Sequence, residues 1–517
     1  MQSVICSLLM SISILFGTVS AAFPQCPPIY TFTSEAAVTL GHSFTSAGDV
    51  NNDGYADLIV GARWWDADGF LFGRAYVFSG LDGDTLYIFN GEETFDEFGH
   101  SAASAGDVNN DGYDDLIIGA YAINSGTGRV YVFSGLDGDT LYVFNGELSG
   151  DVFGTTVSSA GDVNNDGYSD LLVIAEFAGV QSQGKVYVFS GLDGDILYIF
   201  NNGTAASAGD VNHDGHVDLI VAGSIGPFDS RLYVISGLNG DTLYKYANEE
   251  PGDGFGFSAA SAGDVNNDGY ADLIVGARYY GNGTQTGRAY VFSGLDGDTL
   301  YVFTGEAVGN RLGWSVASAG DVNNDGYADL IVGAPDFRYV SDENSYRIGR
   351  AYVFSGLNGE TLQVFTGEAE WEQLGLSVAS AGDVNNDGYS DLIVGLHEWN
   401  DYGFLVGRAY VYSGQCEVTA VEDDLDLSLP TGYQLLQNFP NPFNPTTTIA
   451  FSLPQAGKYS LTIFNILGQV VERFESEARA PGDYFVKWKA SNQASGVYFY
   501  RLKVGDFIDT KKMTLLK

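Results

Sequence analysis

Short apolar runs separated by acidic, glycine-rich loops recur along most of this 517-residue chain. The first full copy is GDVNNDGYADLIVGA, residues 48–62, and its DLIVGA portion is apolar without alternation, as in strands buried on both faces. The segments AYVFS and TLYIF that follow are rich in aromatic and β-branched residues and are joined by a GLDGD turn, which predicts a hairpin. An FG or LG segment, such as Phe98-Gly99, predicts a further strand before the acidic loops, except in the fourth repeat, where Asn202-Gly203-Thr204 replaces it and the strand is expected to be short or irregular.

The acidic loop occurs seven times, and successive copies lie 48 to 62 residues apart. Four strands in a unit of this length, without helical periodicity, are typical of a β-propeller blade. We therefore predict an all-β fold with a seven-bladed β-propeller over residues 22–416. The last copy lacks its TLYVF segment, and residues 29–32, IYTF, are predicted to supply that strand and close the ring.

The chain begins with an apolar stretch, residues 1–21, that ends in Val19-Ser20-Ala21 and fits a signal peptide. No Lys or Arg precedes Arg63, so the usual positive start is missing. No other apolar run is long enough to span a bilayer. Cys26 precedes the closing strand and Cys416 follows its partner; they are either two unrelated thiols or, as we predict, a disulfide across the closure.

The formal net charge is −43, from 66 acidic and 23 basic residues. Such a surface repels phosphate backbones, which disfavours nucleic acid as a partner, and instead favours metal cations. The charge changes along the chain: residues 1–432 carry −47, whereas residues 433–517 carry +4. We expect an acidic linker at 417–432 and a separate, small Ig-like β-sandwich at 433–517.

Each acidic loop places oxygen side chains at positions 1, 3, 5 and 9, and position 7 can offer its backbone carbonyl. Three carboxylates and an amide are hard oxygen donors that suit Ca²⁺, and the glycine at position 6 permits the turn. The alternative is a metal-free turn, since Asp, Asn and Gly all favour turns. The predicted ligands are Asp49, Asn51, Asp53, Tyr55, Asp57; Asp107, Asn109, Asp111, Tyr113, Asp115; Asp162, Asn164, Asp166, Tyr168, Asp170; Asp210, Asn212, Asp214, His216, Asp218; Asp264, Asn266, Asp268, Tyr270, Asp272; Asp321, Asn323, Asp325, Tyr327, Asp329; and Asp383, Asn385, Asp387, Tyr389, Asp391.

The FG segments, the DxNxDGxxD loops and the DLIVGA strands together resemble FG-GAP repeats, the units of the seven-bladed propeller of integrin α subunits. The resemblance covers about residues 29–414. It implies that up to seven Ca²⁺ ions bind in these loops and that the calcium is structural.

In an up-and-down blade the calcium loops share one face, and the connections that vary between repeats share the other. Those connections hold the candidate ligand-binding residues Trp64, Trp65, Tyr279, Tyr280, Trp371, Trp399 and Tyr402. They form either a recognition surface for glycan or protein, or loops that pack their own aromatic rings. A cation before the third strand of every blade, from Arg74 to Arg408, is expected to pair with a nearby acid.

The last module contains QNFPNPFNPTTTI, NILGQ from Asn465, SGVYFYRL from Ser495 and KKMTLLK. This combination resembles the type A C-terminal sorting domain of the type IX secretion system. It implies export to the outer surface of a Gram-negative bacterium through that machinery; the alternative is an ordinary Ig-like binding module.

No GxSxG motif, catalytic Cys or zinc spacing occurs, so no enzyme is predicted. We expect a secreted or surface-displayed calcium-binding propeller that mediates adhesion to an extracellular protein or glycan. The alternatives are a lectin-like polysaccharide-binding accessory protein and, second, an enzyme acting on polysaccharide.

Overall fold

The computed structural model describes residues 27–33, 43–64, 66–67, 70–179, 184–201, 203–226, 229–281, 283–340, 345–369, 371–399, 405–414, 433–435, 438, 446–454, 458–475, 482–490, 493–505 and 507–515. The chain forms two compact units, Met1–Thr419 and Ala420–Lys517. The predicted signal peptide, the whole of the predicted linker, Cys26 and Cys416 lie outside the described residues.

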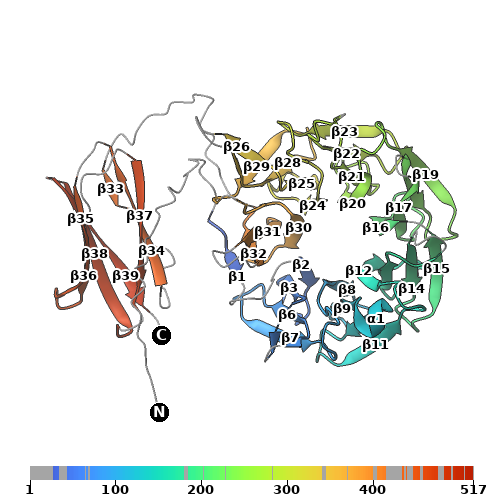
Figure 1. Ribbon diagram of the computed structural model, residues 1–517, viewed down its shortest axis with the longest axis horizontal. Helices are drawn as coiled ribbons and strands as arrows, with labels where there is room; N and C mark the ends of the chain where they lie inside the picture. The colour runs from blue at the N-terminus through green and yellow to red at the C-terminus, as the bar shows by residue number, and fades with distance from the viewer. Residues whose placement is uncertain are drawn as a thin grey trace, which may run out of the picture. The chain divides into compact units, whose positions relative to one another are not determined.

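The first unit is a ring of seven four-stranded antiparallel sheets, seen face-on in Figure 1. From the inner to the outer strand, the sheets of blades 1 to 4 are β2 (Phe44–Gly48), β3 (Asp57–Ala62), β6 (Arg74–Phe78), β7 (Thr85–Asn90); β8 (Ser101–Gly106), β9 (Asp115–Ala120), β10 (Arg129–Phe133), β11 (Thr140–Asn145); β12 (Phe153–Gly161), β13 (Asp170–Ala175), β14 (Lys185–Phe189), β15 (Ile196–Asn201); and β16 (Thr204–Gly209), β17 (Asp218–Gly226), β18 (Asp229–Ile235), β19 (Thr242–Ala247). Blades 5 to 7 are β20 (Phe255–Gly263), β21 (Asp272–Ala277), β22 (Arg288–Phe292), β23 (Thr299–Thr304); β24 (Val316–Gly320), β25 (Asp329–Ala334), β28 (Arg350–Phe354), β29 (Thr361–Thr366); and β30 (Ser377–Gly382), β31 (Asp391–Trp399), β32 (Leu405–Tyr412), β1 (Tyr30–Thr33).

The DLIVGA runs form the second strand of each blade and are buried at every described position in β3, β9, β13, β21 and β25. Their alternate side chains pack against the blades on either side, which explains why these strands are apolar throughout. The inner strands contact their neighbours all the way round, including β2 against β30. The predicted all-β, seven-bladed propeller is confirmed.

The seventh blade combines the two ends of this unit. Strand β1 pairs antiparallel with β32, with Tyr30 opposite Val411 and Thr33 opposite Arg408. The N–H of Ile29 adds a 2.7 Å hydrogen bond to the carbonyl of Val411. Because the outermost strand of this sheet comes from the start of the chain, unfolding either end opens the ring.

At four seams of the described residues, close approach between blades depends on two glycines, one in the second strand of a blade and one in the FG or LG segment of the next. A Cβ atom on Gly119 would lie 2.1 Å from the carbonyl oxygen of Gly154, the FG glycine of the next blade. In blade 4 the residues Asn202-Gly203-Thr204 replace the FG segment, and the preceding blade has Ile174 at the position of Gly119. Ile174 is buried, so a larger side chain occupies the space at the one seam where the FG segment is absent.

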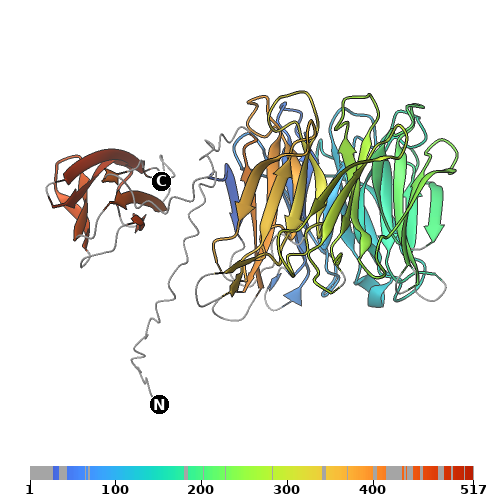
Figure 2. The ribbon, with the colours of Figure 1, turned by 90° about the horizontal axis from the view of Figure 1, so that it is seen from above.

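The edge view of the ring shows loops on two faces (Figure 2). The acidic loops and the GLDGD turns share one of them, because the turn residue Gly80 donates its N–H to the loop residue Asp57. The opposite face, called here the connection face, carries the variable connections. These include the hairpins β4 (Asp66–Ala67)–β5 (Phe70–Leu71) and β26 (Arg338–Val340)–β27 (Ser345–Arg347), and the helical turn α1 (Ile123–Gly126).

The second unit packs two sheets around one core. One sheet is β33 (Gln434–Leu435), β34 (Thr446–Leu453) and β37 (Gly482–Lys489); the other is β36 (Val470–Glu475), β35 (Tyr459–Asn465), β38 (Gly496–Val504) and β39 (Phe507–Leu515). Trp488 from the first sheet and Tyr500 from the second are buried in the same hydrophobic cluster. The predicted β-sandwich is confirmed. Among the described residues no helix is long and apolar enough to cross a bilayer.

Candidate functional site

The acidic loop of blade 1 folds through side-chain to backbone hydrogen bonds. The Asp49 carboxylate accepts the N–H groups of Asp53 at 3.0 Å and Gly54 at 2.9 Å. The side-chain oxygen of Asn51 accepts the same Asp53 N–H, and Asp53 in turn accepts the N–H of Tyr55. The turn needs Gly54, whose φ of 91° lies in the left-handed region. In all seven loops the position 1 aspartate accepts the N–H groups of positions 5 and 6, and the position 5 aspartate accepts the N–H of position 7.

The ninth residue of the loop is a wholly buried aspartate. In blade 1 one oxygen of Asp57 accepts the N–H of Val50 and the other accepts the N–H of Gly80, each at 3.0 Å. The carboxylate therefore joins the loop to the β6–β7 turn. The same pair of bonds holds Asp115, Asp170, Asp218, Asp272, Asp329 and Asp391.

Burial raises the pKa of these aspartates above their ordinary value. The pKa reaches about 6 for Asp57, Asp170, Asp218 and Asp272, and about 7 for Asp115, Asp329 and Asp391. The backbone N–H donors lower it in part, while the loop's neighbouring carboxylates raise it further. Each blade thus holds a buried acid whose negative charge is disfavoured without a cation.

The chemistry of this donor set fits calcium. Three carboxylates and an amide oxygen lie within nine residues, and no ion pair within the described part of the chain uses any of these aspartates. Their oxygens accept backbone N–H groups instead, and among the described residues no group of three or more His, Cys, Asp or Glu side chains is arranged to hold a metal. The assignment of the loop residues as calcium ligands stays a prediction.

The turn glycine whose N–H donates to the buried aspartate also accepts a hydrogen bond from the neighbouring blade through its carbonyl. The hydroxyl of Tyr30 donates to the carbonyl of Gly80 at 2.8 Å, and Tyr87 donates to Gly135 at 2.8 Å. Tyr142, Tyr198, Tyr244 and Tyr301 repeat this bond to Gly191, Gly237, Gly294 and Gly356. At the last seam the amide of Gln363 donates to Gly414 instead. Each acidic loop is thereby connected through one glycine to the outer strand of the preceding blade.

The loops also contact each other directly around the ring. The N–H of Asp114 donates to the backbone carbonyl of Asp49, and Ser169 donates to that of Asp107. Four later seams carry the same bond, from Val217, Ala271, Ala328 and Ser390 to Asp162, Asp210, Asp264 and Asp321. Each of these hydrogen bonds couples the position of one acidic loop to the loop of the next blade.

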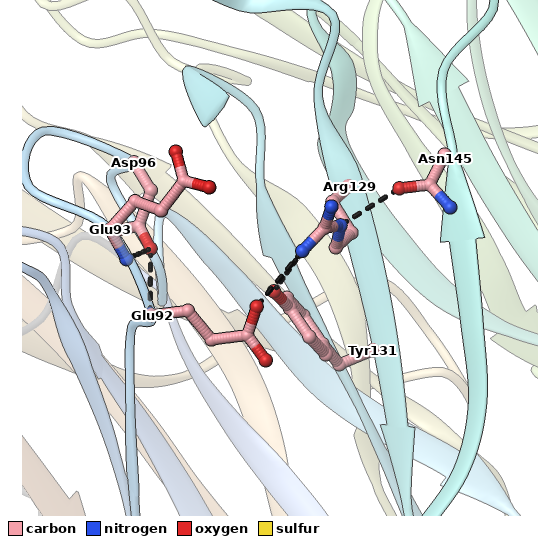
Figure 3. Close-up of polar contacts among 6 residues, drawn as sticks. All are labelled: Glu92, Glu93, Asp96, Arg129, Tyr131 and Asn145. Carbon is pink, nitrogen blue, oxygen red and sulfur yellow. Dashed lines mark hydrogen bonds and ion pairs between the residues drawn. The ribbon is translucent and has the colours of Figure 1, made fainter. Parts of the chain in front are cut away.

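The cation near the start of the third strand pairs with an acid in six of the blades, and in blade 1 Arg74 bonds to the side chain of Asn90. Figure 3 shows Arg129 bonded to Glu92 of the preceding blade at 2.9 Å and to Asn145 of its own blade at 2.8 Å. Asp96 accepts the backbone N–H groups of Glu92 and Glu93, which fixes the segment that carries the Glu92 carboxylate. Glutamates of the preceding blade also pair with Lys185, Arg288 and Arg350, whereas Arg231 pairs with Asp229 of its own strand. This cation is part of the architecture.

The predicted ligand-binding aromatics that the structure describes lie in several different blades, and their role in binding stays a prediction. Trp64 lies over Arg63 in blade 1, and Tyr280 lies over Arg288 in blade 5. Tyr279 and Trp371 both lie beside arginines of blades 5 and 6. Trp399 ends β31, and Trp65 and Tyr402 lie outside the described residues.

Sequence reasoning missed the seam residues and the arginines around Tyr279 and Trp371. The tyrosine of TLYVF could have been found, since it recurs in six of the seven outer strands. Arg278 and Arg311 could not, because no repeat pattern places them together.

Comparison with known proteins identifies both parts of the chain. Residues 41–78, 98–133, 153–189, 255–292 and 312–354 match the FG-GAP repeat family. Residues 437–515 match the secretion system C-terminal sorting domain. Blades 4 and 7 lie outside the matched segments but form the same four-stranded sheets.

Integrin α subunits are among the similar proteins. The chain is 32% identical to integrin alpha-5 of Xenopus laevis over 181 residues, 32% of this chain and 17% of that protein. It is 36% identical to integrin alpha-8 of Mus musculus over 146 residues (27% and 13%) and 31% identical to integrin alpha-IIb of Mus musculus over 206 residues (37% and 16%). The chain thus covers less than a fifth of these relatives.

The resemblances inferred from the sequence are confirmed: the chain carries FG-GAP repeats homologous to those of integrin α subunits, followed by a sorting domain. The repeats contain buried aspartate motifs typical of Ca²⁺ binding. The sorting domain indicates secretion to, or beyond, the outer surface of a Gram-negative bacterium and implies contact with the type IX secretion machinery.

Proposed function

We propose that this protein is a calcium-stabilised adhesive propeller that its sorting domain delivers to the cell surface, where the connection face binds an extracellular ligand. The observation that carries the proposal is that one face of the ring is uniform from blade to blade, whereas the other varies. One face is built from seven near-identical loops, and a backbone hydrogen bond joins neighbouring loops at six seams. The other carries connections that differ in length and in aromatic content from blade to blade.

Up to seven Ca²⁺ ions would serve as structural ions in this proposal, one in each acidic loop. A bound divalent cation would neutralise the buried aspartate that holds both loop and turn. Because the same turn glycine accepts the tyrosine of the preceding blade, each occupied loop would stabilise a seam as well as a blade.

An enzymatic role has less support. A cavity of about 270 Å³ beside the ring closure includes two acids in its lining, Glu368 and Glu372. Glu372 is buried and already accepts the N–H of Ala369 while its other oxygen faces Arg408 at 3.8 Å. This acid supports the loop before blade 7, so the pair does not form a free acid and base.

Export and adhesion are tested together by comparing cells that produce the full chain with cells that produce residues 1–432 and cells that produce none. We expect the full chain to be removed from intact cells by added protease and to increase attachment to extracellular polysaccharide or protein surfaces. The shortened chain should stay inside the cell and leave attachment at the level of the negative strain. Equal surface exposure of both chains would contradict the export role, and equal attachment of all three strains would contradict the adhesive role.

A further inference from the structure

A group of arginines and aromatic rings lies on the connection face between blades 5 and 6. The guanidinium carbon of Arg278, at the start of the β21–β22 connection, lies 3.1 Å from the ring centre of Phe257, 4.4 Å from that of Trp314 and 4.6 Å from that of Tyr279. Its Nε atom is buried without a hydrogen-bond partner. The side chain of Arg278 forms no hydrogen bond or ion pair with any residue that the structure describes.

Two further arginines of this group share a single acid. Arg311 and Arg347 both contact the buried carboxylate of Asp336, at 2.7 Å and 3.0 Å. Arg311 also lies 5.3 Å from the ring of Tyr279, and Arg347 lies 5.2 Å from the ring of Trp371. Three guanidinium groups against one carboxylate leave a local positive excess on a chain whose net charge is −43.

The equivalent seam between blades 1 and 2 provides an internal comparison. Arg63 follows its DLIVGA strand as Arg278 does, and it lies 3.7 Å from Glu97 and 3.0 Å from the Nδ1 atom of His100. Glu97 immediately precedes its FG segment, and Arg311 immediately precedes the corresponding LG segment. The acid that neutralises Arg63 in one seam is therefore replaced by a second cation in the other.

The chemistry of the group favours a charged sugar polymer. Guanidinium groups bind carboxylate and sulfate oxygens through paired hydrogen bonds, and exposed aromatic rings pack against the apolar faces of sugar rings. Phe257 is 43% exposed and Trp371 is 48% exposed, so both rings are accessible next to the arginines. An acidic peptide would use the positive charge but has less need of two flat exposed rings.

We propose that Arg278, Arg311 and Arg347, with Phe257, Trp314 and Trp371, bind an anionic polysaccharide through its sulfate or carboxylate groups. This inference rests on the proposed role of the connection face and names the ligand class for it. Arg278 lies between the aromatic rings, and Arg347 is held next to Trp371 by Asp336. The site requires residues of blades 5 and 6 together and so exists only in the folded ring.

The test measures binding of the calcium-loaded full chain, without its signal peptide, to dextran sulfate, short oligogalacturonates, uncharged dextran and poly-L-glutamate. We expect binding to dextran sulfate, to oligogalacturonates or to both, and no binding to dextran. Arg278→Gln and Arg311→Glu should each raise the dissociation constant about tenfold or more, the size of a lost charge-assisted contact. Arg63→Gln, which removes the neutralised arginine of the first seam, should change it less than about twofold.

Controls keep a folding defect from imitating a lost contact. Each variant must keep the calcium-loaded melting temperature, and Trp371→Ala, at an exposed position, should weaken binding several-fold without affecting the melt. Arg278→Lys keeps the charge but loses the planar guanidinium, and it should bind with intermediate strength. Added salt should weaken binding of the wild-type chain.

The outcomes separate this inference from the proposed function. Binding of sulfated polymer alone or of uronate alone supports it and identifies the anion. Absence of binding to both, equal loss in Arg63→Gln, or arginine-dependent binding of poly-L-glutamate in their place overturns it. If surface attachment persists in an Arg278→Gln, Arg311→Glu double variant while neither polymer binds the wild-type chain, the adhesive function stands and the polysaccharide site fails.

Discussion

The buried aspartates predict an unusual response of the metal-free propeller to pH. A carboxyl group whose pKa is higher in the folded than in the unfolded chain retains its proton preferentially in the fold. Stability is therefore unaffected below the unfolded pKa of 3.8, falls as the pH rises through the interval up to the folded pKa, and stays low above it. We expect the metal-free protein to be less stable at pH 8 than at pH 5.5.

The size of the effect follows from the individual pKa values. Asp115, Asp329 and Asp391 each have a pKa of about 7, so about 1.5 pH units separate pH 5.5 from the folded pKa. This corresponds to a loss of about 2 kcal/mol in the free energy of unfolding per group. For the four aspartates with a pKa of about 6, the corresponding loss is below about 1 kcal/mol each. Calcium prefers the ionised carboxylates and competes with protons, so it should remove this loss and stabilise the fold more at pH 8 than at pH 5.5.

The assay is thermal unfolding followed by circular dichroism at pH 5.5, 6.5, 7.2 and 8, with and without calcium. Metal is removed with a chelating resin, because soluble chelators lose affinity when they are protonated. Asp115→Asn should reduce the stability difference between pH 5.5 and pH 8 by the contribution of one aspartate, whereas Asp139→Asn in the exposed turn should leave that difference unchanged. A metal-free protein that is equally or more stable at pH 8 would refute the reasoning.

Three further changes test how the blades are held together. Tyr87→Phe removes the inter-blade bond to Gly135 and should cost about 1 kcal/mol in the free energy of unfolding, whereas Tyr113→Phe, whose hydroxyl bonds to no described residue, should cost nothing measurable by denaturant titration. Gly119→Ala forces a Cβ to within 2.1 Å of the Gly154 oxygen and should cost about 2 kcal/mol or more in the free energy of unfolding. Gly150→Ala, in open space at φ 88°, should cost only the backbone strain of about 1 kcal/mol. Equal losses in the two variants would count against the packing argument. Asp115→Ala should lower the bound calcium by one ion per chain in elemental analysis and lower the calcium-loaded melting temperature, while Asp139→Ala leaves both unchanged; an unaltered calcium count would show that Asp115 is not a ligand.

Most of the fold was predictable because the repeats present the same pattern seven times. A continuous apolar run such as DLIVGA can be buried on both faces only between neighbouring sheets, and the missing outer strand of the last repeat indicates a closed ring. The burial of the ninth loop residue could not be predicted, since Asp57 sits in a polar, turn-rich segment. Its burial results from the approach of the β6–β7 turn, which lies more than 20 residues further along the chain.

The candidate binding residues were harder to predict for a different reason. Tyr279 and Trp371 were selected as aromatic residues in variable connections, but their surroundings depend on residues from other blades. Arg278 and Arg311 are brought together by the seam between blades 5 and 6, and neither stands out in its own repeat. Contacts between repeats carry no periodic signal when they occur at a single seam.

The central claim is that calcium in the seven acidic loops stabilises a closed ring. Its most direct test is elemental analysis of the exported protein after equilibration with calcium, combined with its melting temperature before and after metal removal at pH 8. We predict close to seven calcium ions per chain and a marked fall in melting temperature when they are removed. A protein that holds no calcium and melts at the same temperature in both states would contradict the claim.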